Sequence, residues 1–290
     1  MSPQELIDKI NNASHLGEVL ELNDWKKQYG EMARLLHPDL CKIPEAADAF
    51  ARLNALKEGW EKGYRFSDDA GAVRAQNTTV TFVGDPKLLL QSYRNYGYLK
   101  SLRHPAAQHF HRYLPESMAL DGEVLTLQLH HRAAPLSGLT LQQGHTNWIL
   151  SRLLEFSAWL AQEGWTHCGI NPESVLVVPE THGIILSSFY HLTPLEGAVK
   201  TISAKYKHWY PNALFVDKKA VPMIDLELSK RTIATLLGDP SGMGIKLQKT
   251  HNPAMIDFLL TAHSDAFECY DKYRKLLDKH FPKKFLPLNL

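Results

Sequence analysis

Residues 34–39 read Arg34-Leu35-Leu36-His37-Pro38-Asp39 and end a helical pattern. Proline disfavours helical backbone at the residue before it, so we expect the preceding helix to end near Leu36. A second helix is predicted to begin near Pro44, because proline is favoured in the first helical turn. The sequence therefore predicts two helices joined by an exposed turn that carries His37 and Asp39.

Both flanking segments carry one apolar face at helical spacing. Before the turn, this face consists of Trp25, Tyr29, Met32 and Leu36. After the turn, it consists of Ala47, Phe50, Leu53, Leu56 and Trp60, and Gly63 closes the segment. Two such faces bury most simply against each other, so we expect an antiparallel helical hairpin. A further short helix is predicted over residues 3–11, with Ser2 as its N-cap.

Several stretches of this region resemble the J domain of DnaJ-type co-chaperones. They are Val19-Leu20-Glu21-Leu22, Lys26-Lys27-Gln28-Tyr29, Ala33-Arg34-Leu35-Leu36-His37-Pro38-Asp39 and Ala49-Phe50-Ala51-Arg52-Leu53-Asn54, and the resemblance covers roughly residues 16 to 63. It implies that His37, Pro38 and Asp39 bind a DnaK-type chaperone of the heat-shock protein 70 family and stimulate its ATPase. The resemblance implies the same role for Lys26 and Lys27.

The basic face of the first helix is thinner than the family's. Gly30 and Glu31 stand where the family usually carries further basic residues, which predicts weaker or more selective chaperone binding. Arg34 lies seven residues after Lys27 on the face opposite the apolar one, so we add Arg34 to the expected binding residues. The alternative interpretation is a plain helical hairpin with a solvated basic side.

Composition limits the class of protein. A chain of 290 residues with 44% hydrophobic and 22% charged residues has room for two globular domains, and the junction is expected near residue 64. A net charge of +1 gives no overall attraction to nucleic acid or an acidic membrane, so neither is a predicted partner. Cys41, Cys168 and Cys269 are far apart, and no signal-peptide pattern opens the chain, so a cytoplasmic protein with free thiols is expected.

The region after residue 64 changes from strands to helices, which predicts an α+β fold. Strands are expected at 79–83, 109–113 and 124–130, with a helix at 87–102 among them. The later part is expected to contain helices at 147–163, 225–237, 253–263 and 265–280, and a strand pair at 175–178 and 184–186.

Local motifs in this second region resemble those of protein kinases, over roughly residues 64 to 290. Residues 165–177, which read Trp-Thr-His-Cys-Gly-Ile-Asn-Pro-Glu-Ser-Val-Leu-Val, resemble the catalytic loop and the strand after it. Residues 186–190 fall where kinases carry Asp-Phe-Gly, residues 102–105 resemble the turn after helix C, and residues 225–238 resemble helix F. The resemblance implies a two-lobed kinase-like domain after the N-terminal J-like hairpin.

The residues that perform phosphoryl transfer in kinases are missing. Gly169, Ser174 and Ser188 stand where kinases have the catalytic Asp, the Asn and the Asp that hold magnesium. Glycine cannot accept a proton, and serine is a poor ligand for a hard divalent cation. Val83 and Asn95 replace the expected lysine and glutamate, and no GxGxxG precedes them. We therefore predict a pseudokinase with no catalytic residue and no cofactor.

The favoured hypothesis is a co-chaperone or adaptor whose kinase-like region binds a client or a regulatory partner. One alternative is an atypical kinase or nucleotide-dependent transferase, with metal ligands among Asp68, Asp69 and Asp85. Another is a scaffold that regulates a separate kinase or phosphatase.

Histidine and cysteine patterns suggest no further site. His109 and His111 would share a face of the expected strand, but no third ligand is evident, and His130 with His131 matches no zinc spacing. No metal site is predicted. Cys168 beside His167 is interpreted as structural, because sequence neighbours rarely form a nucleophilic dyad.

Overall fold

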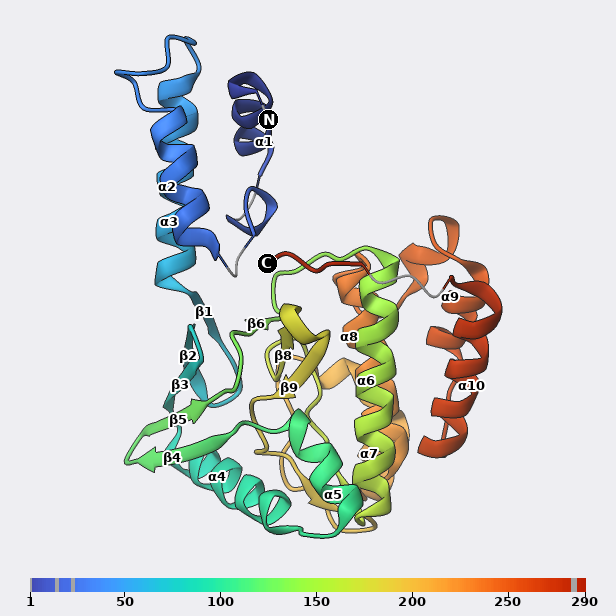
Figure 1. The fold of residues 1–290 in the computed structure, drawn as a ribbon. Helices are drawn as coiled ribbons and strands as arrows, with labels where there is room; N and C mark the ends of the chain where they lie inside the picture. Colours follow the sequence, from blue (N-terminus) through green and yellow to red (C-terminus); the bar gives the residue numbers. More distant parts are fainter. Residues whose placement is uncertain (1, 14–15, 22–23, 283–285) are drawn as a thin grey trace. The chain divides into compact units, whose positions relative to one another are not determined.

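The computed structural model describes residues 2–13, 16–21, 24–282 and 286–290. Leu22, quoted above for the J-domain resemblance, lies outside these ranges. The chain mixes helices and β-sheet, and it divides into two compact units, residues 1–64 with 287–290 and residues 65–286 (Figure 1). The last four residues, which the sequence division assigns to the second domain, group with the first unit. Within the described ranges, no helix is long and apolar enough to cross a membrane.

The first unit is helical. Its elements are α1 (Pro3–Asn12), the short 3-10 helix η1 (Leu16–Glu18), α2 (Trp25–Leu35) and α3 (Ala46–Lys62). The predicted cap of α1 is confirmed: the Ser2 hydroxyl accepts the Glu5 N–H at 3.3 Å, and the Glu5 carboxylate accepts the Ser2 N–H at 2.7 Å. Figure 1 shows α2 and α3 running antiparallel, as the two apolar faces predict.

The core of the first unit joins α1, α3 and the end of α2. Its fully buried members include Ile10, Leu36 and Leu53, and Trp25, Tyr29 and Met32 of α2 pack against them, which confirms the predicted apolar face of the first hairpin helix. The Tyr29 hydroxyl donates to Asn54 Oδ1 at 2.5 Å and so links α2 to α3.

The predicted start and inner face of α3 are partly wrong. The helix begins at Ala46, because Pro44 and Glu45 form a turn before it. Ala46 and Ala49 are buried and Ala47 is exposed. The helix phase follows Ala46, Ala49 and Leu53, at spacings that keep all three on one face.

The second unit begins with an antiparallel sheet whose strands lie in the order β1-β2-β3-β5-β4. The strands are β1 (Tyr64–Ser67), β2 (Gly71–Gln76), β3 (Thr79–Gly84), β4 (Ser117–Asp121) and β5 (Val124–Gln128). The predicted strands at 79–83 and 124–130 and the helix at 87–102 are confirmed, the helix as α4 (Pro86–Ser101).

The predicted strand at 109–113 is wrong. These residues lie in α5 (Pro105–Phe110) and in the 3-10 helix η3 (His111–Tyr113). The His104 ring accepts the Ala107 N–H at 3.3 Å, and Pro105 occupies the first helical position, so a helix starts here instead of a strand. His109 and His111 therefore do not share a strand face.

Helices dominate the rest of the second unit. α6 (Gln143–Gln162) packs against α8 (Pro222–Leu236) and α10 (Ala266–His280), and Figure 1 shows α6 beside both. The other elements are β6 (Ala134–Pro135), β7 (Trp165–Thr166), β8 (Val175–Val178), η4 (Pro179–Thr181), β9 (Gly183–Leu186), β10 (Thr193–Pro194), η5 (Lys207–Trp209), α7 (Asn212–Asp217), η6 (Ile245–Lys249) and α9 (Pro253–Leu260). The predicted pair of β8 and β9 is confirmed, and it forms a three-stranded sheet with β6.

Candidate functional site

The turn after α2 is compact although its side chains are exposed. Leu36 is fully buried and anchors it to the core of the first unit. The His37 carbonyl accepts the N–H groups of Leu40 and Cys41, both at 2.9 Å. Asp39 and the Pro38 between it and His37 are exposed, as the sequence predicts. The backbone therefore fixes the turn, while its polar side chains remain available to a partner.

His37 and Asp39 form a pair on this turn. His37 Nδ1 accepts the Asp39 N–H at 3.2 Å and lies 3.5 Å from Asp39 Oδ2. The edge of the His37 ring meets Phe50 of α3, with 5.8 Å between ring centroids. Because Nδ1 accepts a hydrogen bond, a neutral ring carries its proton on Nε2. The ring is thus oriented by α3 and by its own turn.

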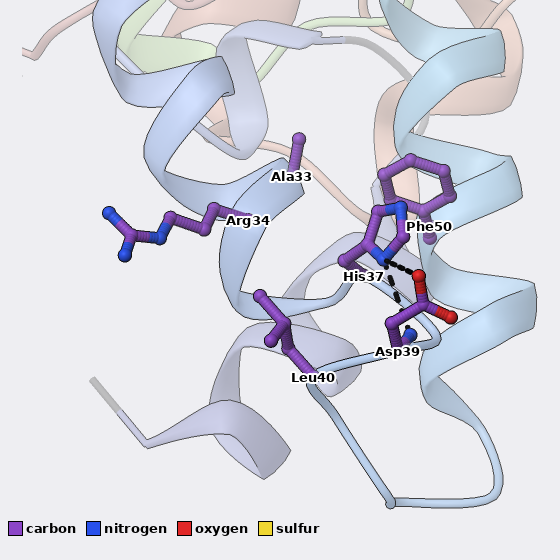
Figure 2. Close-up of a pocket in the computed structure, with 6 residues that line it drawn as sticks. All are labelled: Ala33, Arg34, His37, Asp39, Leu40 and Phe50. Carbon is purple, nitrogen blue, oxygen red and sulfur yellow. Dashed lines mark hydrogen bonds and ion pairs between the residues drawn. The ribbon is translucent and has the colours of Figure 1, made fainter.

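A shallow hollow of about 490 Å³ lies at the turn (Figure 2). It is lined by Ala33, Arg34, His37, Asp39, Leu40 and Phe50. Figure 2 shows the Arg34 side chain pointing away from the His37–Asp39 pair, so Arg34 borders the hollow without neutralising Asp39. This surface offers one cation, one acid and apolar carbon within a small area.

A second hollow, of about 810 Å³, shares Arg34 and Leu40 with the first. Leu35 and Leu40 line it and are 52% and 66% exposed. The two leucines therefore place exposed apolar surface on both sides of the turn. Neither leucine is among the site residues predicted from the sequence, although adjacent Leu35 and Leu36 cannot both face the core of one helix.

Lys26 and Lys27 lie apart from the hollow. Both are exposed in the first turn of α2, about 12 Å along the helix axis from its end. The Lys26 ammonium lies 5.8 Å from the centre of the Trp25 ring. The structure therefore brings together His37, Asp39 and Arg34, while the two lysines lie at the other end of the same helix.

The kinase-like positions of the second unit are buried. Gly169 and Ser174 lie in a segment that Asp225 of α8 supports by accepting the His167 and Cys168 N–H groups at 2.7 and 2.8 Å. Burial raises the pKa of Asp225 to about 7 even though these two N–H groups favour its ionised form. Ser174 Oγ is engaged by the backbone of Asn171.

The side chain of His191 occupies the space beside Gly169. A Cβ atom built on Gly169 would lie 2.7 Å from His191 Cδ2, closer than two such carbons approach. Ser188 is also buried, and Asn95 of α4 donates to the Phe189 carbonyl at 2.7 Å. The positions expected to hold reacting groups are therefore filled by the chain's own packing.

The three carboxylates proposed for an atypical metal site are separately engaged. Asp85 caps α4 by accepting the Lys87 N–H at 2.8 Å, Asp68 accepts the Tyr190 hydroxyl at 2.5 Å, and Asp69 pairs with His191 at 3.2 Å. The described part of the chain contains no group of three or more His, Cys, Asp or Glu side chains arranged to hold a metal ion.

Cys168 has no access to a substrate. The residue is fully buried, and burial raises the pKa of its thiol well above the ordinary value. Its φ of +57° and the Asp225 contact give it a role in shaping the backbone.

The sequence was compared with known protein families and with curated proteins. No model of a known protein family matches this chain, and a search of curated proteins finds no match either.

Proposed function

We propose that this protein is a co-chaperone or adaptor that recruits a DnaK-type chaperone through the first unit and stimulates its ATPase. The proposal rests on one observation above all: His37 and Asp39 are held by backbone and ring contacts on a turn that exposes both side chains. Exposed polar side chains on a rigid turn lose little conformational entropy when a partner binds.

Three features of the surface support this role. Arg34 supplies a cation at the hollow, while Lys26 and Lys27 extend the positive charge along α2. Glu31 interrupts this charge, and Leu35 and Leu40 add apolar area next to the turn. We therefore propose a contact in which apolar burial replaces part of the electrostatic attraction, so its affinity depends less on salt than that of a fully basic helix.

For the second unit we propose a kinase-like domain that binds a client or regulatory protein without transferring phosphate. The support is local: Gly169 offers no proton acceptor, and the His191 side chain stands beside it. Ser174 is engaged by its neighbours, and Ser188 is buried. A transferase would need a proton acceptor and metal ligands that face a substrate.

The chaperone role is tested by single-turnover ATP hydrolysis of a DnaK-type chaperone mixed with the full-length chain. We expect wild type to accelerate hydrolysis. The acceleration by His37→Gln should be at least ten-fold smaller, because the His37 ring is proposed to contact the chaperone. Lys62→Gln is the matched control, because it removes an exposed side chain of the first unit at the far end of α3.

Two results would argue against the proposal. Absence of acceleration by wild type, across chaperones from several families, would remove the co-chaperone role. Equal acceleration by wild type and His37→Gln would show that some other surface acts on the chaperone.

A further inference from the structure

The turn between β1 and β2 inserts an acidic side chain into a polar site of the second unit. Asp69 of this turn reaches residues more than a hundred positions later in the chain. Its Oδ2 lies 3.2 Å from His191 Nε2, and its Oδ1 accepts the Ser203 hydroxyl at 2.9 Å. Both partners are almost fully buried, and the Asp69 side chain is 16% exposed.

The two residues that donate to Asp69 are each held by a second hydrogen-bond partner. His191 Nδ1 is hydrogen-bonded to Thr201 Oγ1 at 2.8 Å, and Nε2 faces the Asp69 carboxylate, which can only accept, so Nε2 is the donor. Ser203 is fixed by its own N–H, which donates to the Tyr210 hydroxyl at 3.0 Å. A ring N–H and a hydroxyl that converge on one point form a site for an oxyanion.

The turn that carries Asp69 is held in place by its own backbone. Gly71 has φ of +150°, and a Cβ atom on it would lie 2.4 Å from the Val83 carbonyl oxygen. A Cβ atom on Gly84, its partner in the register of β2 and β3, would lie 1.8 Å from the Ala70 carbonyl oxygen. Two glycines therefore permit a close approach of strands that a side chain would prevent, and this approach directs Asp69 inward.

The neighbouring Asp68 secures the same turn. Its Oδ1 accepts the N–H groups of Ala70 and Gly71 at 2.9 and 3.2 Å, and its Oδ2 accepts the Tyr190 hydroxyl at 2.5 Å. Burial raises the pKa of Asp68 in spite of these bonds. Burial works in the same direction on Asp69, but the bonds and charge of His191 and the bond from Ser203 outweigh it and lower the pKa of Asp69. Of the two carboxylates, Asp69 is therefore the one whose surroundings favour the ionised form.

We propose that His191 and Ser203 form an oxyanion-binding site and that Asp69 is its internal ligand. A carboxylate or phosphoryl group from solution then finds the site occupied, and it enters only if the β1–β2 turn leaves. This inference does not depend on the chaperone role proposed above.

The test is thermal unfolding of the full chain in formate, phosphate or chloride at constant ionic strength. Asp69→Gly removes the carboxylate and opens room for a small anion. We expect it to melt several degrees below wild type in chloride and to regain about 3 °C or more as formate or phosphate rises to tens of millimolar, because binding to the folded state raises the melting temperature. Wild type should gain only the general stabilisation that a kosmotropic salt such as phosphate gives any folded protein, so the gain of the variant is measured in excess of it.

Two controls separate an anion site from a general loss of stability. Asp69→Asn removes the charge but leaves no room, so formate should not rescue it. Asp121→Gly changes an exposed aspartate at the end of β4 in the same sheet and should show neither a large loss nor a rescue. If Asp69→Gly does not fold in chloride, Asp69→Ala is compared in the same salts, since it also leaves room.

The inference is overturned if neither Asp69→Gly nor Asp69→Ala responds to formate or phosphate more than to chloride. It is also overturned if phosphate, or ADP with magnesium, raises the melting temperature of wild type as much as that of Asp69→Gly. Rescue by formate alone would limit the site to carboxylates, and rescue by both anions would extend it to phosphoryl groups.

Discussion

The two units use the same pair of residues in opposite ways. In the first unit, His37 lies 3.5 Å from Asp39, and the side chains are 47% and 86% exposed. In the second unit, His191 lies 3.2 Å from Asp69, and the side chains are 4% and 16% exposed. The exposed pair contributes little to folding because water screens it, whereas loss of one member of the buried pair leaves a charge without solvation. The His–Asp pair of the first unit is thus exposed to a partner, whereas that of the second unit is buried and stabilises the fold.

The largest expected effect comes from breaking the buried pair. His191→Ala leaves the Asp69 carboxylate buried without its main donor, so we expect the free energy of unfolding of the second unit to fall by about 3 kcal/mol. Urea denaturation followed by tryptophan fluorescence measures this change. A loss below about 1 kcal/mol would mean that water solvates Asp69 and that the site is not closed.

A smaller loss is expected from placing an acidic side chain at Gly169. Gly169→Asp places a side chain where the His191 ring already lies, and such overpacking costs about 2 kcal/mol. The same denaturation experiment measures the cost, and a phosphate-transfer assay of the variant should stay at background. If Gly169→Asp is as stable as wild type and transfers phosphate, the His191 ring does not fill the space beside residue 169.

A third effect concerns His167, which is buried between the rings of Phe156 and Phe189. Burial lowers the pKa of His167 to about 3, below its unfolded value, so the unfolded chain binds a proton first. The stability that the neutral ring contributes is therefore present above about pH 6.5 and is lost as the pH falls toward 3.

This effect is isolated by subtracting a variant that cannot titrate. Between pH 6.5 and 5.5 we expect wild type to lose about 1 kcal/mol of unfolding free energy relative to His167→Phe. Urea denaturation of both proteins across this pH range provides the measurement. A difference that does not change with pH would mean that folding leaves the pKa of the ring unchanged.

The smallest effect is expected at the exposed pair. His37→Gln and Asp39→Asn should each change the unfolding free energy of the first unit by less than about 0.5 kcal/mol. Circular dichroism during urea denaturation measures this change. A loss of 2 kcal/mol from either variant would mean that the turn serves the fold, and reduced chaperone stimulation could then no longer be assigned to a lost contact.

The sequence predicts the first unit better than the second. Periodicity places α1, α2 and α3 within a few residues, because each has one apolar face and a recognisable cap or break. The local pattern could not predict that Ala47 is exposed. Three alanines lie within four residues, so the sequence does not show which of them faces the core. A strand is predicted at 109–113, but these residues are helical because the His104 cap starts a helix before them.

The candidate sites differ in the same way. The His37 turn follows from adjacent residues, so a local motif is enough to predict its exposure. The site around Asp69 joins side chains separated by more than a hundred residues, and no local pattern relates Asp69 to His191. The sequence predicts Asp69 only as a possible metal ligand, whereas the structure shows it paired with His191 and Ser203.

The central claim is that the exposed turn acts on a partner while the buried site serves the fold. The most direct measurement is the single-turnover ATPase rate of a DnaK-type chaperone with wild type, His37→Gln and Gly169→Asp, each as the full chain. The account predicts acceleration by wild type and by any folded Gly169→Asp, and at least a ten-fold loss with His37→Gln. Full acceleration by His37→Gln, together with loss in Gly169→Asp, would contradict it.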